Sequence, residues 1–466
     1  MTLTKTPIHF IGIGGAGMSG IAKILLQLGA KISGSDMKES ETTIRLQEMG
    51  AKIYLGHDAR NIGADIGTVV YSSAIPQDNV EMVAAKSRGI EVLARAEMLA
   101  RLMARQESIA VAGAHGKTTT TAMISLMLEI NKMDPTIIIG GDLRQIGSNA
   151  KLGTGRYLVA EADESDGSFL KLFPKIAVIT NIENDHLDYY RSVKNIVNAF
   201  VRFVEQIPKD GFVVICLDNK ELSKIKNTVK ANYVTYAING EEADYTAKNF
   251  SFRGTNSSCE VFYRKEKVGI LELNVPGKHN ISNALAAIAT GMELGLSFPQ
   301  AAAGLKEFTG TKRRFELIDR VDGITIFDDY AHHPTELRAT LSAAKTAGYQ
   351  RIIAIFQPHR YTRTKLLQFE FGDSFSDADI VVINEIYSAS EKPIPGVSAQ
   401  LIINAIKNSD HEKEVVYCPT EDDIIEYLRR EGRPGDLVIT LGAGNIRQAG
   451  VRYAREYRLL TEGKEL

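Results

Sequence analysis

The chain has 466 residues, of which 44% are hydrophobic, and its 55 Lys and Arg residues nearly balance its 57 Asp and Glu residues. This length predicts roughly three domains of about 150 residues each. The formal net charge of -2 gives no reason to expect nucleic acid or an anionic membrane as a partner, and it favours chemistry on small molecules.

The cysteines and the N-terminal segment indicate the compartment. Three widely spaced cysteines without a CxxC pair favour free thiols in a reducing cytosol. They are Cys216, Cys259 and Cys418. Residues 1–15 lack the pattern of a signal peptide, and no apolar run approaches the roughly 20 residues of a membrane span. We therefore expect a cytoplasmic protein without membrane insertion.

A glycine-rich loop at residues 12–17 (GIGGAG) follows the first predicted strand and opens a helix predicted from about Ala16 to Leu28. The next strand ends at Asp36, about 20 residues further on, as in a dinucleotide fold. Such a loop holds a diphosphate on the helix N-terminus, which fits NAD or a UDP-sugar. The alternative, a tight turn without a ligand, is disfavoured because so many glycines weaken a fold unless the backbone must approach something closely.

A second loop at residues 113–119 (GAHGKTT) lies between the strand SIAVAG and a long predicted helix. This order points backbone N–H groups at a phosphate chain, with Lys117 on the terminal phosphates and the Thr118 hydroxyl on Mg²⁺. The GxxxxGK[ST] pattern is shortened, because Gly113 is only three residues before Gly116. The alternative is a glycine-rich turn with an incidental lysine. Together, the two loops favour two bound nucleotides over a simple dehydrogenase.

Acidic and histidine side chains follow the next strands of this region. Glu161 ends the strand YLVAE, where open α/β sheets place their ligands, and is a candidate Mg²⁺ ligand. Asp163, Glu164 and Asp166 crowd the same loop, and a solvated acidic turn is the alternative. His186 lies in a second polar cluster after the strand KIAVITN, where it would ligate a metal or orient water.

The last third of the chain returns to alternating strands and helices, with polar loops after two strands. Residues 328–336 (DDYAHHPTE) follow GITIFDD, and residues 357–363 (QPHRYTR) follow RIIAIFQ. Arg360 and Arg363 provide paired donors of the kind that bind the carboxylate of an amino acid, although an exposed basic turn is the alternative. Six of the nine histidines lie in such polar loops: His115, His186, His279, His332, His333 and His359.

These motifs resemble those of the Mur ligases of bacterial cell-wall synthesis, and the resemblance spans essentially the whole chain. Its elements are GIGGAGMSGIA, SGSD, AGAHGKTTTT, EADESD, TNIENDHLD, GKHNISNALAA, DDYAHHPTE and QPHRYTRT. The resemblance implies an α/β fold of three domains. They are an N-terminal Rossmann-like domain for a UDP-sugar (1–106), a central P-loop ATPase-type domain with a mixed sheet (107–311), and a C-terminal Rossmann-like domain for the amino acid (312–466).

The resemblance also implies roles for individual residues. Those expected to bind ATP are Gly113, Ala114, His115, Gly116, Lys117, Thr118 and Thr119, with His279 and Asn283 at the adenine and Arg314, Asp329 and Tyr330 from the third domain. Mg²⁺ is expected on Thr118, Glu161 and His186. The UDP-sugar is expected on Gly12, Gly14, Gly15, Gly17, Met18, Ser19, Asp36 and Ser72, and alanine on His359, Arg360 and Arg363. Lys117, His186, His332 and Arg363 are the expected catalytic residues.

The implied reaction joins L-alanine to the lactyl carboxylate of UDP-N-acetylmuramate through an acyl phosphate, with release of ADP and phosphate. The nearest alternative is the branch of the family that attaches a whole tripeptide to the same UDP-sugar. An NAD-dependent oxidoreductase and a binding protein without bond-forming chemistry are more distant alternatives. Several relatives carry a carbamylated lysine that supports a second metal, but Phe200 stands at that position. We expect a monomer or a weak dimer.

Overall fold

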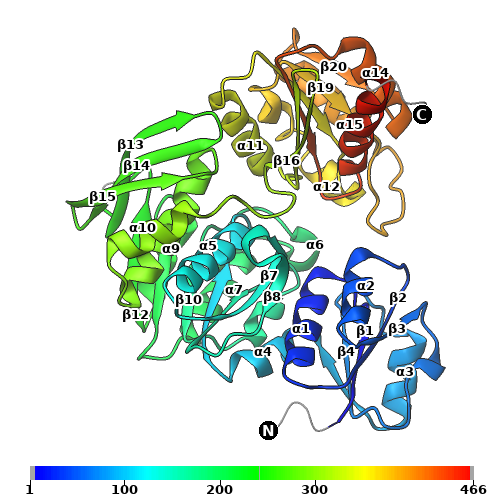
Figure 1. The fold of residues 1–466 in the computed structure, drawn as a ribbon, viewed down its shortest axis with the longest axis vertical. Coiled ribbons are helices and arrows are strands. Elements are labelled where there is room, and N and C mark those ends of the chain that lie inside the picture. Colours follow the sequence, from blue (N-terminus) through cyan, green and yellow to red (C-terminus); the bar gives the residue numbers. More distant parts are fainter. Residues whose placement is uncertain (1–5, 241, 462–466) are drawn as a thin grey trace. The chain divides into compact units, whose positions relative to one another are not determined.

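The computed structural model describes residues 6–240 and 242–461, so the first five residues of the segment judged to lack a signal peptide lie outside the described part (Figure 1). The chain divides into two compact units. The first comprises residues 1–248, 260–271 and 282–308, and the second comprises residues 249–259, 272–281 and 309–466. Within the described residues, no helix is long and apolar enough to cross a membrane.

The N-terminal sheet of the first unit is parallel, with the strand order β3-β2-β1-β4-β5. All four residues of its central strand β1 are buried, and three of them are apolar, as expected for a strand covered by helices on both faces. The strands are β1 (Ile8–Ile11), β2 (Ile32–Asp36), β3 (Lys52–Leu55), β4 (Thr68–Tyr71) and β5 (Glu91–Ala94). The helices are α1 (Ala16–Gln27), α2 (Glu41–Glu48), α3 (Val80–Ser87) and α4 (Arg95–Met103).

A buried carboxylate, Glu81, ties α3 to this sheet. Its Oε2 accepts hydrogen bonds from the Ser35 hydroxyl at 2.6 Å and from Nδ1 of His57 at 2.9 Å. Its Oε1 accepts from the Asn61 amide at 2.6 Å and lies 3.5 Å from Nε2 of His9. Burial alone would raise the pKa of Glu81, but these donors outweigh it and lower the pKa to about 2.

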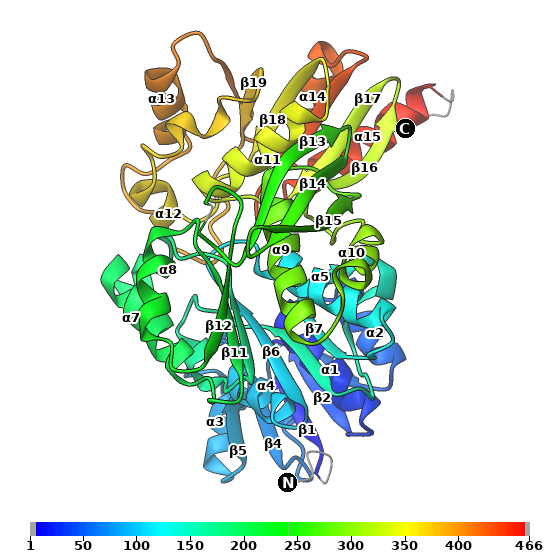
Figure 2. The same cartoon turned by 90° about the vertical axis from the view of Figure 1, so that its left-hand side faces the viewer.

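The second sheet is mixed, with the order β15-β14-β13-β12-β11-β10-β6-β9-β7-β8, and β7 and β8 pair in antiparallel fashion. Figure 2 shows α7 and α8 beside β11 and β12. The strands are β6 (Glu107–Ala112), β7 (Thr136–Leu143), β8 (Ser148–Lys151), β9 (Tyr157–Glu161), β10 (Ile176–Ile179), β11 (Phe212–Cys216), β12 (Asn232–Ala237), β13 (Tyr245–Arg253), β14 (Asn256–Tyr263) and β15 (Glu266–Leu273). The helices are α5 (Lys117–Ile130), α6 (Leu187–Tyr190), α7 (Val193–Glu205), α8 (Lys220–Ile225), α9 (Lys278–Glu293) and α10 (Phe298–Lys306).

The third sheet has the order β16-β17-β21-β18-β19-β20, and only the β16–β17 pair is antiparallel among the described strands. Apolar clusters fill both of its faces. The strands are β16 (Glu316–Val321), β17 (Ile324–Asp329), β18 (Arg351–Phe356), β19 (Ile380–Ile383), β20 (Glu414–Tyr417) and β21 (Asp436–Leu441). The helices are α11 (Pro334–Thr346), α12 (Tyr361–Leu366), α13 (Gln400–Ser409), α14 (Glu421–Glu431) and α15 (Arg447–Thr461).

These sheets confirm the predicted fold class, a three-domain α/β chain with parallel or mixed sheets. The predicted residue boundaries between the domains stay predictions. In each sheet, the glycine-rich and polar loops named above follow the carboxyl ends of strands, which is where open α/β sheets bind their ligands.

We predict that Glu81→Gln lowers the free energy of unfolding at pH 7 by about 3 kcal/mol, because the carboxylate loses its stabilised charged form. A lowered pKa contributes stability above the unfolded-state pKa of 4.5 and loses it as the pH falls towards about 2. The difference between variant and wild type in urea denaturation should therefore shrink from pH 5 to pH 3. The surface variant Glu41→Gln is the control, and a constant Glu81→Gln difference across these pH values would contradict the prediction.

Candidate active site

The loop at residues 113–119 needs glycine at two positions. Gly113 has φ +139°, and a Cβ atom there would collide with Thr180 Oγ1. Gly116 has φ +81°, and its Cβ would lie 2.5 Å from Oδ1 of Asn283. Both residues therefore need the left-handed backbone and the space that glycine alone provides. α5 begins directly after Gly116, so its first N–H groups have no partner within the helix.

Two residues after β10 hold this loop in place. The Asn181 side chain accepts a hydrogen bond from the His115 N–H at 2.9 Å and donates to the His115 carbonyl at 3.0 Å. Thr180 donates to the same carbonyl at 2.6 Å, and the Ala114 N–H donates to the Asn181 carbonyl at 3.2 Å. The amides of Ala114 and His115 thus shape the loop, which leaves the amides at the start of α5 to face a phosphate.

Lys117 folds back over the loop. Its ammonium donates to the carbonyls of Gly113 and Ala114 at 2.5 and 3.1 Å and to Oε1 of Glu164 at 2.9 Å. Burial alone would lower the pKa of Lys117, but the carboxylates of Glu164 and Asp163 outweigh it and keep the pKa above its ordinary value. The lysine is therefore charged at neutral pH and is held by groups that an anionic ligand can replace.

The acidic loop after β9 brings Glu164, rather than Glu161, to Lys117. Glu164 is buried, and its Oε1 lies 3.7 Å from Nε2 of His186. Its Oε2 has no hydrogen-bond partner among the described residues. Glu161 accepts a hydrogen bond from the Gly140 N–H at 2.7 Å. Sequence reasoning placed Glu164 in this loop but assigned it no role.

Phe200, the residue at the position of the carbamylated lysine of some relatives, is a core residue. It is buried on α7, and its ring centroid lies 5.2 Å from that of Phe169, which also contacts Phe203. The main chain of Phe169 donates to the carbonyl of Asp163 at 3.2 Å. The aromatic cluster therefore anchors the acidic loop by apolar packing.

The N-terminal glycine loop lies beside the predicted Asp36 and Ser72. The Gly14 N–H donates to Oδ2 of Asp36 at 2.9 Å, so this carboxylate holds the loop itself. A Cβ on Gly12, which has φ +79°, would lie 3.3 Å from Cβ of Ser72. The side chains of Met18 and Ser19 are buried. Any contact of these last two residues with a ligand would therefore use their main chain.

A residue that sequence reasoning missed connects the central sheet to the glycine-loop helix. Asn149, on β8, donates from its side-chain amide to the Ala16 carbonyl at 2.9 Å and to the Ser19 hydroxyl at 3.0 Å. These bonds fix the first turn of α1 against the β7–β8 hairpin, whose Gly140 contacts Glu161. No sequence signal marks Asn149, because its partners are more than a hundred positions away along the chain.

The second unit gathers the predicted His332, His359 and Arg363. The rings of His332 and His359 meet edge to face at 5.6 Å, and Nη1 of Arg363 donates to Nδ1 of His359 at 3.2 Å. Nδ1 of His332 lies 2.9 Å from the Tyr330 carbonyl, which can only accept, so this nitrogen carries the proton. Burial, assisted by the nearby Arg363 charge, outweighs the opposing effect of Glu336 and lowers the pKa of His332 to about 3, so the ring is neutral at pH 7.

Arg314, Asp329 and Tyr330 lie beside this cluster. The Arg314 guanidinium lies 5.3 Å from the centre of the Tyr330 ring and 3.4 Å from Glu336. The oxygens of Asp329 accept hydrogen bonds from the main-chain N–H groups of Phe315 and Ala331, which joins the loop before β16 to the loop after β17. Burial raises the pKa of Asp329 to about 6.

The two residues predicted at the adenine belong to different units. In the second unit, burial and the nearby Arg314 charge lower the pKa of His279 to about 4, so its ring is neutral at pH 7. In the first unit, Asn283 accepts a hydrogen bond from the Thr120 hydroxyl at 3.2 Å and lies against Gly116.

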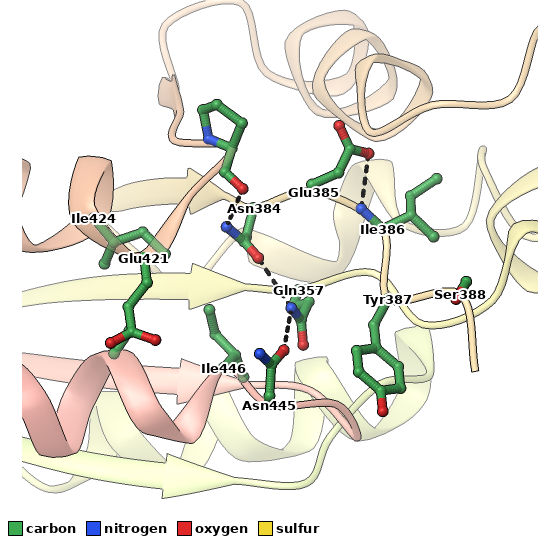
Figure 3. Close-up of a pocket in the computed structure, with 12 residues that line it drawn as sticks. Gln357, Asn384, Glu385, Ile386, Tyr387, Ser388, Glu421, Ile424, Asn445 and Ile446 are labelled. Atoms are coloured by element: carbon green, nitrogen blue, oxygen red, sulfur yellow. Dashed lines mark hydrogen bonds between the residues drawn. The ribbon is translucent and has the colours of Figure 1, made fainter. Parts of the chain in front are cut away.

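The QPHRYTR segment starts from a polar anchor in the second unit. Gln357 donates to Oδ1 of Asn384 at 3.0 Å and to Oδ1 of Asn445 at 2.9 Å, as Figure 3 shows. These three side chains follow β18, β19 and β21 and line a pocket at the carboxyl ends of the strands. The ring of Tyr387, from the same pocket, stacks on His359.

The two arginines of this segment have separate partners. Arg360 lies 3.9 Å from Glu391, and that carboxylate also accepts hydrogen bonds from the main chain and hydroxyl of Thr362. Arg363 contacts His359. Sequence reasoning identified both arginines but missed Glu391, which follows β19 after an irregular stretch without a motif.

The chain matches three models of one family. They are described as the Mur ligase family, catalytic domain (residues 7–107), the Mur ligase middle domain (111–291) and the Mur ligase, glutamate ligase domain (313–444).

Individual relatives cover almost the whole chain. The chain is 54% identical to the UDP-N-acetylmuramate–L-alanine ligase of Pelotomaculum thermopropionicum over 97% of this chain and 98% of that protein. A UDP-N-acetylmuramate–alanine ligase structure from Thermotoga maritima has a TM-score of 0.84 at 30% identity, covering 97% and 99% of the two chains. A murein peptide ligase from Psychrobacter arcticus has a TM-score of 0.73 at 26% identity, covering 97% and 98%.

We predict that Asn181→Ala weakens ATP binding about tenfold, because the variant loses both side-chain hydrogen bonds to His115. Isothermal titration calorimetry with a non-hydrolysable ATP analogue measures the effect. Asn184→Ala is the matched control, since Asn184 lies in the same segment and is exposed. Equal affinities of the two variants would contradict the assigned role of Asn181.

Proposed function

Because the chain belongs to the Mur ligase family, we propose that its two nucleotide loops and its third sheet serve one reaction, the attachment of L-alanine to UDP-N-acetylmuramate. The protein is an ATP-dependent ligase of peptidoglycan precursor synthesis. The observation that carries this conclusion is the near-complete match to relatives that act on L-alanine. The murein peptide ligases are more distant, so the tripeptide-recycling reaction is the less supported alternative.

The reaction has two chemical steps. The lactyl carboxylate attacks the γ-phosphate of ATP, which forms an acyl phosphate and releases ADP. The amine of L-alanine then attacks the acyl carbon, and phosphate leaves through a tetrahedral intermediate. Because the carboxylate, the phosphates and the intermediate are all anionic, fixed positive charge and positioning must carry much of the catalysis.

Lys117 is the proposed phosphate-binding cation. It is charged, and its present partners are two carbonyl groups and Glu164. We propose that the β- and γ-phosphates of ATP replace these partners, together with the amides of Gly116, Lys117, Thr118 and Thr119 at the start of α5. The neutral ring of His279 and the amide of Asn283 suit hydrogen bonds to an adenine.

The donor set near this loop fits Mg²⁺, which prefers oxygen ligands. Thr118, Glu161 and His186 are the proposed ligands, and the proposal is supported by Oε2 of Glu164, which is buried and has no hydrogen-bond partner among the described residues. When bound, Mg²⁺ would neutralise charge on the phosphates. Phe200 offers no ligand for a second ion, because its side chain is apolar and buried.

For the other two substrates, we propose separate sites. The UDP diphosphate lies on the loop of Gly12, Gly14, Gly15 and Gly17 at the start of α1, beside Ser72, and Asp36 keeps this loop in shape. The alanine carboxylate binds to Arg360 and Arg363 in the QPHRYTR segment. His332 is neutral and a weak base, so it orients the alanine amine through Nε2 and does not store a proton.

We propose the following domain boundaries and location for the protein. The domains are residues 1–106, 107–311 and 312–466, and Arg314, Asp329 and Tyr330 contribute to nucleotide binding from the third of them. The protein works in the cytoplasm as a monomer or a weak dimer, without nucleic acid as a partner.

We predict that phosphate release requires ATP, UDP-N-acetylmuramate and L-alanine together. We also predict that Lys117→Ala reduces turnover by a factor on the order of 10³, because the variant loses a positive charge positioned at the phosphates. A coupled phosphate assay with each substrate omitted in turn measures this dependence. Lys220→Ala, which removes an exposed lysine of the same unit, is the control.

Two results would overturn parts of this proposal. Equal phosphate release without an amino acid would reject the ligase reaction. Faster turnover with a tripeptide than with L-alanine would assign the chain to the recycling branch.

A further inference from the structure

Arg95 lies against the glycine loop, although no sequence motif marks it. It begins α4, directly after β5. A Cβ atom on Gly17 would lie 2.8 Å from Nη1 and 3.1 Å from Cδ of Arg95. Gly17 does not have a positive φ angle, so its backbone conformation does not demand glycine. Position 17 is glycine because Arg95 occupies the space over the first turn of α1 that a side chain at this position would need.

The other end of the same guanidinium is held by the acidic loop. Nη2 of Arg95 donates to Oδ2 of Asp163 at 2.9 Å, and Oδ1 of Asp163 accepts from the Ser165 N–H at 3.1 Å. The side chain of Arg95 is 18% exposed, so it is fixed and remains open to a ligand. Asp163 stands two residues after the proposed Mg²⁺ ligand Glu161.

Arg95 brings a second positive group to the first turn of α1, where Asp163 holds Nη2 of its guanidinium and Asp36 binds the Gly14 N–H. The N-cap residue Gly15 makes no side-chain cap, and the first turn of α1 contains no acidic residue. A helix N-terminus carries partial positive charge, so the nearby guanidinium adds charge of the same sign. A diphosphate on this loop would be bound by the helix N-terminus and by the guanidinium, whose paired donors match phosphate oxygens.

We propose that Arg95 binds the diphosphate of the UDP-sugar together with the N-terminus of α1, while Asp163 holds its guanidinium in place. This inference rests on the proposed function, because it takes the glycine loop as the UDP-sugar site. It also gives the acidic loop a second role: the segment that carries Glu161 for the ATP site orients, through Asp163, the arginine of the other nucleotide site.

The test compares Arg95→Gln with Arg101→Gln in the full-length protein. Arg101 lies on the same helix and pairs with Glu91 at 2.6 Å, so it is a matched control. Calorimetry with UDP and with uridine separates phosphate contacts from base and ribose contacts. We expect the Kd of UDP to rise about tenfold or more in Arg95→Gln and that of uridine to stay unchanged, because a charge-assisted contact to phosphate is lost. Arg101→Gln should match wild type for both ligands.

Several outcomes would overturn the assignment. Wild-type UDP affinity in Arg95→Gln would exclude a diphosphate contact, and an equal loss for uridine would show a merely structural role. A loss for UDP-N-acetylmuramate but not for UDP or UDP-N-acetylglucosamine would place Arg95 at the lactyl carboxylate instead. If Arg95→Gln has a lowered melting temperature, Arg95→Lys keeps the charge and should show an intermediate UDP affinity; wild-type or fully lost affinity there would contradict the proposal.

The experiment separates this inference from the proposed function. Wild-type protein that binds UDP through Arg95 but releases no phosphate with L-alanine would reject the ligase reaction and leave the arginine contact standing. Wild-type protein with normal turnover and no effect of Arg95→Gln on UDP binding would reject only the contact.

Discussion

The buried ion pair between Lys117 and Glu164 organises the first unit. An ammonium group away from water is costly unless a carboxylate or hydrogen-bond acceptors surround it. The acidic loop after β9 supplies Glu164, and the carbonyls of the phosphate loop supply the rest. The loop must therefore curl tightly, which explains the glycines at 113 and 116 and the side chain of Asn181 that supports the curl.

Much of the fold could be predicted, because its central strands are apolar runs between glycine-rich or polar loops. β6, β9, β10, β17 and β18 are largely buried, and all were predicted from the sequence. The short strands β3, β5 and β20 could not be recognised, since each has four residues and exposed positions. β8 reads SNAK, and only its pairing with β7 makes this polar segment a strand.

The residues of the candidate site likewise fall into those that the sequence could predict and those that it could not. Residues within local motifs, such as Lys117, His332 and Arg363, could be predicted, because a strand followed by a polar loop is recognisable over a short stretch of sequence. Residues whose role depends on a distant partner were missed. Gln357 meets Asn445 across 88 positions and Arg95 meets Asp163 across 68, and no local pattern contains such a pair. The side-chain roles assigned by resemblance stay predictions.

The aromatic cluster of Phe169, Phe200 and Phe203 has a consequence for working conditions. Ion pairs at a surface weaken as salt accumulates, whereas contacts between buried rings are largely indifferent to ionic strength. The acidic loop is joined to this cluster through Phe169, whose ring packs in the cluster and whose N–H donates to the Asp163 carbonyl. We expect its carboxylates to keep their spacing in dilute and concentrated salt alike, so that a change in ionic strength does not loosen the acidic loop.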